Sequence, residues 1–281
     1  MTDIVHPALT DAAASARAAL ADALTSHTRA QLETDDGMGA DGTPTMRIDT
    51  LVEHRILDTL TRHGVNVLSE EAGFLDRGSA YTVVLDPVDG SANAAAGVPL
   101  CALSAALAVD GDFRQALTCW LHTGDTWQAT VDGGSYGPRG EPIRPSSTTT
   151  LDAAAVSLLR PHTATPDGAA WWAVARSARR IRVLSCSTLD IALVASGAID
   201  AFADPGSDTH RLVDLAAGVV FARAGGFVLR DLHDRPLRFT TDLTLRWSGI
   251  TAATEHLADD LASTIHTALT DPTRESPWVS H

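Results

Sequence analysis

Hydrophobic residues recur at helical spacing in two stretches near the amino terminus. Residues 8–33 are rich in alanine, and Leu9, Ala16 and Leu24 belong to one apolar stripe, which predicts a helix. A second helical stripe starts at Thr45 and ends at Gly64, a residue type typical of helix ends. The intervening residues 35–44 are mostly turn formers, so we expect a loop there.

Short runs of β-type residues, separated by Gly and Asp turns, follow the second helix. They predict a sheet with hairpins, from the runs 65–68, 81–85, 102–109, 116–121 and 126–131. Strand and helix patterns alternate in the second half, which predicts layered α/β packing. The expected strands there are 153–159, 180–184, 199–203, 227–230 and 250–253, and the expected helices are 167–178, 187–196, 211–224 and 255–269.

The segment 133–150 is rich in Gly, Pro, Ser and Thr and makes the best boundary between two lobes. We therefore expect an amino-terminal lobe over residues 1–145 and a carboxy-terminal lobe over residues 146–281. The tail from Asp271 contains two prolines, and we expect it to be loose.

The chain of 281 residues is acidic: 35 Asp and Glu oppose 21 basic residues, all of them Arg, for a formal charge of −14. This balance argues against binding a nucleic-acid polymer through a broad basic face. No apolar stretch is long enough for a membrane span, and the amino terminus has no signal core. The three scattered cysteines fit a reducing compartment, so we expect a cytoplasmic protein.

Acidic residues stand at four points where predicted strands end or predicted helices begin. They are Glu70–Glu71 after the run 65–68, Asp86 and Asp89 after the run 81–85, Asp49 in the second helix, and Asp214 in the helix 211–224. Side chains at such points project at the rim of a sheet, where α/β proteins form ligand sites. We expect these carboxylates to form one site.

Hard divalent cations such as Mg²⁺ prefer oxygen ligands, and clustered carboxylates repel one another unless a cation neutralises them. Asp86 and Asp89 flank Pro87, whose ring stiffens the turn, and the Val88 carbonyl lies between them as a further oxygen donor. Gly90 permits a close backbone approach. Each cluster alone also has a structural explanation, as a turn, a solvated strand end or a helix N-terminal acid; their combination favours a metal site.

Together these segments resemble the inositol monophosphatase superfamily, which consists of Mg²⁺-dependent, lithium-sensitive phosphatases. The resemblance spans about residues 35–230. It rests on residues 68–71 (Leu-Ser-Glu-Glu), 83–93 (Val-Val-Leu-Asp-Pro-Val-Asp-Gly-Ser-Ala-Asn) and 213–218 (Val-Asp-Leu-Ala-Ala-Gly). Ser69, Ser91 and Val213 stand where the family usually has Gly, Thr and Trp. Residues 39–45 and Asp49 are most similar to the archaeal-type branch, which acts on inositol phosphate and fructose 1,6-bisphosphate.

The resemblance implies an α/β (α+β) fold, layered as an α-β-α-β-α sandwich, and a homodimer. It implies two or three Mg²⁺ ions. The ligands carried over are Glu70, Asp86, the Val88 carbonyl, Asp89 and Asp214. Glu70 would also lie beside the attacking water.

The resemblance also implies the remaining roles. Asp49 and Ser91 match the pair that orients and deprotonates the water, and Gly90 and Ser91 match the phosphate-binding turn. The substrate-binding positions carried over or inferred beside them are Ser187, Asp204 and Arg211.

The implied activity is hydrolysis of a small phosphorylated polyol or sugar by metal-activated water. Two alternatives remain at this point. One is a nucleotide phosphatase, such as a 3′-nucleotidase for adenosine bisphosphates. The other is a partner protein that kept the fold without catalysis.

Overall fold

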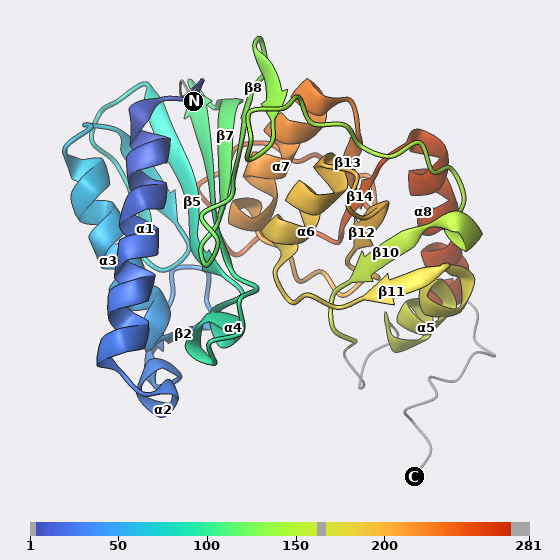
Figure 1. The fold of residues 1–281 in the computed structure, drawn as a ribbon, viewed down its shortest axis with the longest axis horizontal. Coiled ribbons are helices and arrows are strands. Elements are labelled where there is room, and N and C mark those ends of the chain that lie inside the picture. The colour runs from blue at the N-terminus through green and yellow to red at the C-terminus, as the bar shows by residue number, and fades with distance from the viewer. Residues whose placement is uncertain (1–3, 162–166, 271–281) are drawn as a thin grey trace.

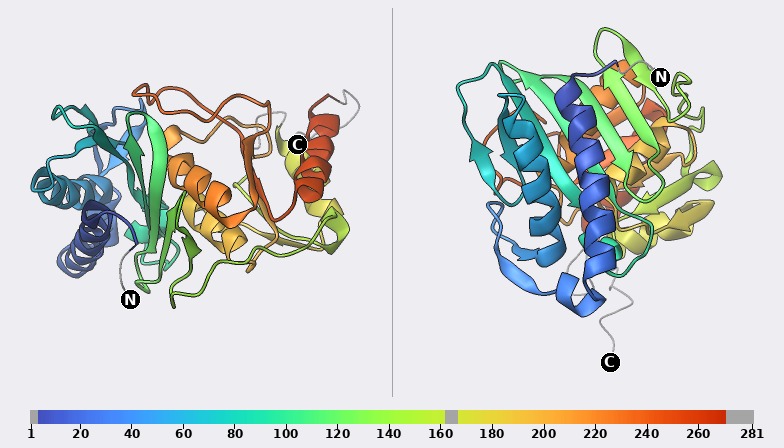
Figure 2. Two further views of the ribbon diagram at one scale, coloured as in Figure 1. Left: turned by 90° about the horizontal axis from the view of Figure 1, so that it is seen from above. Right: turned by 60° about the vertical axis from the view of Figure 1, so that its left-hand side comes forward.

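Three helical layers and two sheets alternate across the molecule (Figure 1). The computed structural model describes residues 4–161 and 167–270. Viewed from above, helices, sheet, helices, sheet and helices follow one another (Figure 2). The predicted α-β-α-β-α architecture is therefore confirmed.

The larger sheet has seven strands in the order β4-β3-β5-β6-β7-β8-β9, and only β3 and β5 are parallel neighbours. The strands are β3 (Asn66–Ser69), β4 (Gly73–Leu75), β5 (Tyr81–Asp89), β6 (Ala102–Val109), β7 (Asp112–Trp120), β8 (Thr126–Thr130) and β9 (Gly134–Tyr136). Both faces of its centre are buried, which explains the continuous apolar runs in the sequence.

Alternation along β6 divides its side chains between two cores. Leu103 and Leu107 pack against the outer helices α1 (Pro7–Ser26) and α3 (Arg47–Thr61). Ala102 and Ala106 face the inner helices α6 (Ser187–Ala195) and α7 (Leu212–Gly225). The small alanines let the inner helices approach the sheet closely.

The smaller sheet has five strands in the order β11-β10-β12-β14-β13. They are β10 (Ala155–Leu158), β11 (Arg180–Arg182), β12 (Ala201–Ala203), β13 (Val228–Asp231) and β14 (Gly249–Ala252). Phe202 faces α6 and α7, whereas its neighbours along β12 face α5 (Asp167–Ser177) and α8 (Glu255–Thr270). The inner helices α6 and α7 thus lie between the two sheets. The boundary between two lobes at residues 145/146 stays a prediction.

Several predicted elements differ from the structure. The helix expected over 8–33 ends at Ser26, because a new N-cap at Thr28 starts the short α2 (Arg29–Leu32). The loop expected over 35–44 contains a small hairpin of β1 (Asp35–Met38) and β2 (Pro44–Met46). The three-residue strands β4 and β9 were not predicted, because their segments are too short and too rich in Gly for a periodic signal.

Two other expectations concern the chain ends and membranes. The tail from Asp271 lies outside the described residues. Within the part that the structure describes, no helix combines the length and the hydrophobicity needed to cross a membrane.

Candidate active site

Parallel pairing brings the first acidic clusters together. β3 and β5 run side by side with Ser69 opposite Leu85, so Glu70 and Asp86 follow at the same edge of the sheet. Two helices add Asp49 and Asp214 from their first turns, α3 from the outer layer and α7 from the inner layer. Four carboxylates lie close enough together to raise the pKa values of their neighbours, and they therefore form one cluster. They are Glu70, Asp86, Asp89 and Asp214.

A bulge at the end of β5 sets the direction of its acids. Asp86 pairs with Ser104 and Asp89 with Ala102, so three steps along β5 match two steps along β6. The Val88 amide donates to Asp86 Oδ1 at 3.1 Å, which holds this turn. Asp86 is 1% exposed, so its carboxylate points into protein rather than into bulk water.

The cluster carries more negative charge than its surroundings neutralise. Burial raises the pKa values of Glu70, Asp86 and Asp89, and neighbouring carboxylates raise them further. The Thr188 amide, at the start of α6, donates to Asp89 Oδ2 at 2.6 Å and partly offsets this rise in its pKa. Such a set of desolvated acids is stable in ionised form only beside a cation.

Arg211 is the positive charge at this site. Its guanidinium contacts Asp41 Oδ2 at 2.6 Å, Glu70, and Asp214 Oδ2 at 3.4 Å. Burial alone would lower the pKa of Arg211, but Asp214 and Glu70 raise it above its usual value. The predicted substrate-binding residue thus lies among the carboxylates in this structure, and its role toward a substrate stays a prediction.

Asp49 and Ser91 lie side by side, as the resemblance implies. Ser91 lies close enough to lower the pKa of Asp49, and the Ser91 hydroxyl donates to the Val88 carbonyl oxygen at 3.0 Å. Burial raises the pKa of Asp49 to about 6, while the Ser91 contact acts in the opposite direction. The Asp49 carboxyl, the Ser91 hydroxyl and the Val88 carbonyl therefore lie together at the edge of the cluster.

Gly90 makes the turn from β5 into the short helix α4 (Ser91–Ala95), seen at the lower edge of Figure 1. Its φ of 85° lies in the left-handed region. A Cβ atom there would come within 2.7 Å of the Leu100 carbonyl oxygen. Both constraints require glycine at this position.

Sequence reasoning missed several residues that build the site. Asp41 is buried and pairs with Arg211, and Thr45 hydrogen-bonds to Glu71. Glu53 accepts the Glu71 amide at 3.2 Å and the Ser69 hydroxyl, so it holds the turn that carries the glutamates. Asp41 lies in a turn-rich segment without periodicity, whereas the helical position of Glu53 beside the apolar stripe was a usable signal.

Burial raises the pKa of Glu71 to about 7, and the Thr45 contact opposes that rise. The neighbouring acids Asp49 and Glu53 also raise the pKa of Glu71, so Glu71 lies beside the same acidic cluster.

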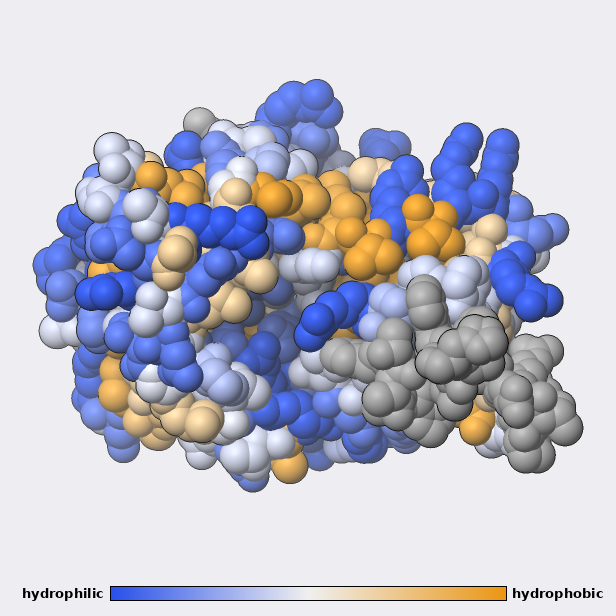
Figure 3. Space-filling view, turned by 90° about the horizontal axis from the view of Figure 1, so that it is seen from below, coloured by the Kyte–Doolittle hydropathy of each residue, from blue (hydrophilic) through white to orange (hydrophobic). Residues whose placement is uncertain are grey.

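A cavity of about 200 Å³ adjoins the acids. It is lined by Asp89, Leu159, Arg160, Ser185, Ser187, Thr209, His210, Arg211 and Asp214. Figure 3 shows the molecule from below, where hydrophilic side chains surround a hollow near its middle. Of the predicted substrate-binding residues, Ser187 and Arg211 line the cavity.

Asp204 is placed differently from the prediction. It is fully buried and is not among the residues that line the cavity. Its carboxylate instead accepts the amides of Gly206, Ser207 and Thr209 at 2.7–3.0 Å. Asp204 therefore organises the loop before α7, and its side chain is already occupied there.

The inositol monophosphatase family model matches residues 4–270. The chain belongs to this family. A fructose-1,6-bisphosphatase/inositol-1-monophosphatase from Thermococcus kodakarensis is 31% identical over 225 residues, which cover 80% of this chain and 84% of the relative. The chain is therefore a phosphoric monoester hydrolase of the inositol monophosphatase family.

Two further comparisons place this family member. A solved structure from Pyrococcus horikoshii, described as a hypothetical protein with similarities for inositol-1 monophosphatase, is 31% identical, with a TM-score of 0.69. The match covers 78% of this chain and 84% of the Pyrococcus horikoshii chain. A bifunctional NADP phosphatase/NAD kinase from Methanococcus maripaludis is 30% identical over 236 residues, which cover 76% of this chain but only 41% of that protein.

The family is generally metal-dependent, and the donors of this chain fit a hard cation. Asp86 is buried and Glu70 and Asp89 are half-buried; all three acids have raised pKa values and offer oxygen. Among the described residues, no group of three or more Asp, Glu, His or Cys side chains is already arranged with the geometry of a metal site. The Arg211 guanidinium instead lies between Glu70 and Asp214.

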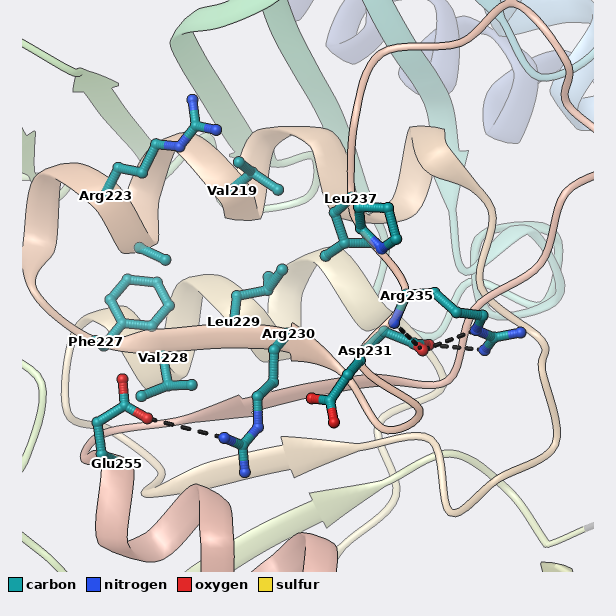
Figure 4. A pocket seen from close by; sticks show the side chains of 13 residues that line it. Val219, Arg223, Phe227, Val228, Leu229, Arg230, Asp231, Arg235, Leu237 and Glu255 are labelled. Carbon is teal, nitrogen blue, oxygen red and sulfur yellow. Dashed lines mark hydrogen bonds and ion pairs between the residues drawn. The ribbon is translucent and has the colours of Figure 1, made fainter.

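A second cavity, of about 540 Å³, lies away from the acids between α7, β13 and the loop that follows β13 (Figure 4). Its floor is apolar, with Phe227 and Leu229. The arginines at its rim are already paired: Arg230 with Asp259 at 2.7 Å, and Arg235 with Asp208 and Asp231 at 2.6 and 2.7 Å. None of the predicted site residues lines it, so the smaller cavity is the candidate active site.

Proposed function

We propose that this family member is a Mg²⁺-dependent phosphomonoesterase that hydrolyses a small phosphorylated polyol or sugar. The observation that carries the proposal is the junction of a buried carboxylate cluster with a small polar cavity lined by Asp89, Ser187 and Asp214. A ligand bound in this cavity has its phosphate beside the acids and its alcohol part beside the serines.

We propose that two or three Mg²⁺ ions bind to Glu70, Asp86, the Val88 carbonyl, Asp89 and Asp214. When bound, the ions activate water and stabilise charge on the phosphate and the leaving oxygen. The chain itself orients the reactants. Asp49 lies beside Ser91, and this pair orients the attacking water and accepts its proton. Glu70 lies in the same cluster and positions that water.

The cavity size favours a single-ring substrate. Pockets for drug-sized ligands usually measure about 300–1,000 Å³, whereas this cavity measures about 200 Å³. An inositol or hexose fits such a space better than a dinucleotide. Arg160 at its lining favours an anionic ligand.

A panel of phosphate esters tests the proposal. Purified protein with Mg²⁺ is expected to release phosphate from inositol 1-phosphate or fructose 1,6-bisphosphate faster than from NADP or adenosine 3′,5′-bisphosphate, and Li⁺ is expected to inhibit the reaction. Asp86→Asn removes the negative charge of a buried ligand and leaves a weaker amide oxygen; it is expected to lower kcat at least about 100-fold, since a bound ion supplies several kcal/mol of stabilisation.

Asp58→Asn, at an exposed position on α3, is the matched control and should retain the wild-type rate. Absence of phosphate release from every ester, or an unchanged rate in Asp86→Asn, contradicts the proposal. A preference for the nucleotides would support the nucleotide phosphatase instead.

We also propose a cytoplasmic homodimer. Cys101, Cys119 and Cys186 are all free and buried, which fits a reducing compartment. The dimer rests on the family resemblance, and sedimentation equilibrium of the purified protein measures it directly.

A further inference from the structure

His210 lies fully inside the protein at the back of the cavity. It is 1% exposed, and its backbone pairs with Trp247 through two hydrogen bonds of 3.0 and 2.9 Å. Its ring packs edge-on against Phe202 with 5.5 Å between the centroids. The imidazole is therefore held from several sides.

Two hydrogen bonds define where the ring proton lies. The Gly249 amide donates to Nδ1 at 3.0 Å, so Nδ1 carries no proton in this arrangement. Nε2 lies 3.2 Å from the Ser187 hydroxyl oxygen. The neutral ring with its proton on Nε2 satisfies both contacts, and in it Nε2 donates to Ser187 Oγ.

This contact determines the direction in which the Ser187 hydroxyl hydrogen-bonds. Since its oxygen accepts from His210, its own proton is directed elsewhere. Ser187 lines the cavity together with Asp89 and Asp214. We propose that His210 is a positioning residue that turns Ser187 into a hydrogen-bond donor for an oxygen of the substrate's alcohol part.

The proposed pair selects for a class of substrate. It rests on the proposed phosphatase function and adds that the alcohol part carries hydroxyl oxygens beside the ester. A polyol or sugar offers such an acceptor, whereas a plain hydrocarbon alcohol leaves the Ser187 donor unsatisfied. An unpaired buried donor is costly, so the pair rejects unsubstituted rings.

Two esters that differ only in hydroxyl groups test this selection: inositol 1-phosphate and cyclohexyl phosphate. The measured quantity is the ratio of their kcat/KM values with Mg²⁺. Wild-type protein is expected to prefer the inositol ester. Ser187→Ala is expected to lower this ratio about tenfold, the value of one good hydrogen bond. Ser177→Ala, on the exposed face of α5, is the matched control and should keep the ratio.

Two replacements of His210 separate its contacts. His210→Asn retains an acceptor for the Gly249 amide but has no donor that reaches Ser187, and it is expected to lower the ratio about threefold. His210→Gln retains a donor near the Nε2 position and is expected to keep most of the preference. The double variant Ser187→Ala/His210→Asn should match Ser187→Ala alone, because both changes remove one interaction.

Loss of folded protein cannot imitate these results, because it lowers both rates equally. An unchanged ratio in Ser187→Ala, equal effects of the Asn and Gln variants, or full additivity in the double variant would overturn the proposal. Failure of wild-type protein to hydrolyse any ester would overturn the phosphatase function and this inference with it. Hydrolysis of both esters with an unmoved ratio would overturn the inference alone.

Nitrogen NMR of the ring gives a readout independent of turnover. We expect a neutral His210 with the proton on Nε2 and a bare Nδ1, and His210→Asn assigns the signal. A proton on Nδ1 would contradict the proposed hydrogen bond, in which His210 Nε2 donates to Ser187 Oγ.

Discussion

Arg211 offsets part of the negative charge of the acidic site in the structure described here. Its guanidinium contacts Asp41, Glu70 and Asp214, which come from three separate segments of the chain. Each of these acids is mostly buried, so the arginine replaces the water that would otherwise solvate them. A divalent cation at the same carboxylates would take over this task.

Replacement of Arg211 by Met is expected to destabilise the metal-free protein by about 3 kcal/mol, since removing one partner leaves buried charges uncompensated. Mg²⁺ is expected to restore most of this loss, because the ion supplies the missing charge. Calorimetry in EDTA and in Mg²⁺ measures both effects.

Arg235→Met is the matched control, because Arg235 pairs with Asp208 and Asp231 away from the site. Its loss of stability should be the same with and without Mg²⁺. An equal loss for Arg211→Met in both conditions would show that Arg211 is a plain structural ion pair.

At the scale of elements, two inner helices direct their amino termini at the acids. Thr188, in the first turn of α6, donates its amide to Asp89, and Asp214 lies in the first turn of α7. Helix amino termini carry partial positive charge, which favours carboxylates there. The turn from β5 into α4 depends on the left-handed conformation of Gly90.

Gly90→Ala is expected to cost more than Gly78→Ala, although both glycines have positive φ angles, 85° and 70°. The shared backbone conformation costs about 1 kcal/mol for alanine. At Gly90 the new methyl also meets the Leu100 carbonyl at 2.7 Å, whereas nothing lies within 4 Å at Gly78. We expect an additional loss of about 2 kcal/mol at Gly90, measured by urea unfolding. Equal losses would contradict this packing argument.

At the scale of the molecule, the site draws on both sheets and on the inner and outer helices. Its acids raise one another's pKa values because the fold buries them together. An acid with a raised folded-state pKa contributes stability below its unfolded value, near pH 4, and loses it as the pH rises through the folded value. For Asp49 and Glu71 these folded values are about 6 and about 7.

The stabilisation by Mg²⁺ is therefore expected to grow between pH 5 and pH 8. As the pH rises the metal-free protein loses stability at Asp49 and Glu71, whereas their ionised forms strengthen the attraction of the neighbouring carboxylate cluster for a cation. Scanning calorimetry with Mg²⁺ and with EDTA at each pH gives the difference in Tm. A difference that stays constant over this range would contradict the coupling, and Asp86→Asn should show a smaller increase.

Local pattern predicted most elements correctly. The runs 102–109 and 126–131 became β6 and β8, and the stripe before Gly64 became α3, because period-2 and period-3.6 burial leave strong signals. The hairpin of β1 and β2 was not predicted, since β1 is exposed throughout and the segment 35–44 is rich in turn formers. Its strands form by pairing with each other rather than by burying an apolar face.

The sequence by itself predicted most helices and strands from burial periodicity, a local property, and the layered fold and the acids of the site through the family resemblance of its motifs. Only the tertiary structure decided that Arg211 joins Asp41 and Glu70, that Asp204 binds its own loop, and that His210 reaches Ser187. Those partners lie far apart along the chain or depend on a side chain's direction. Which donor meets which acceptor is therefore settled by packing between layers, and no spacing along the sequence records it.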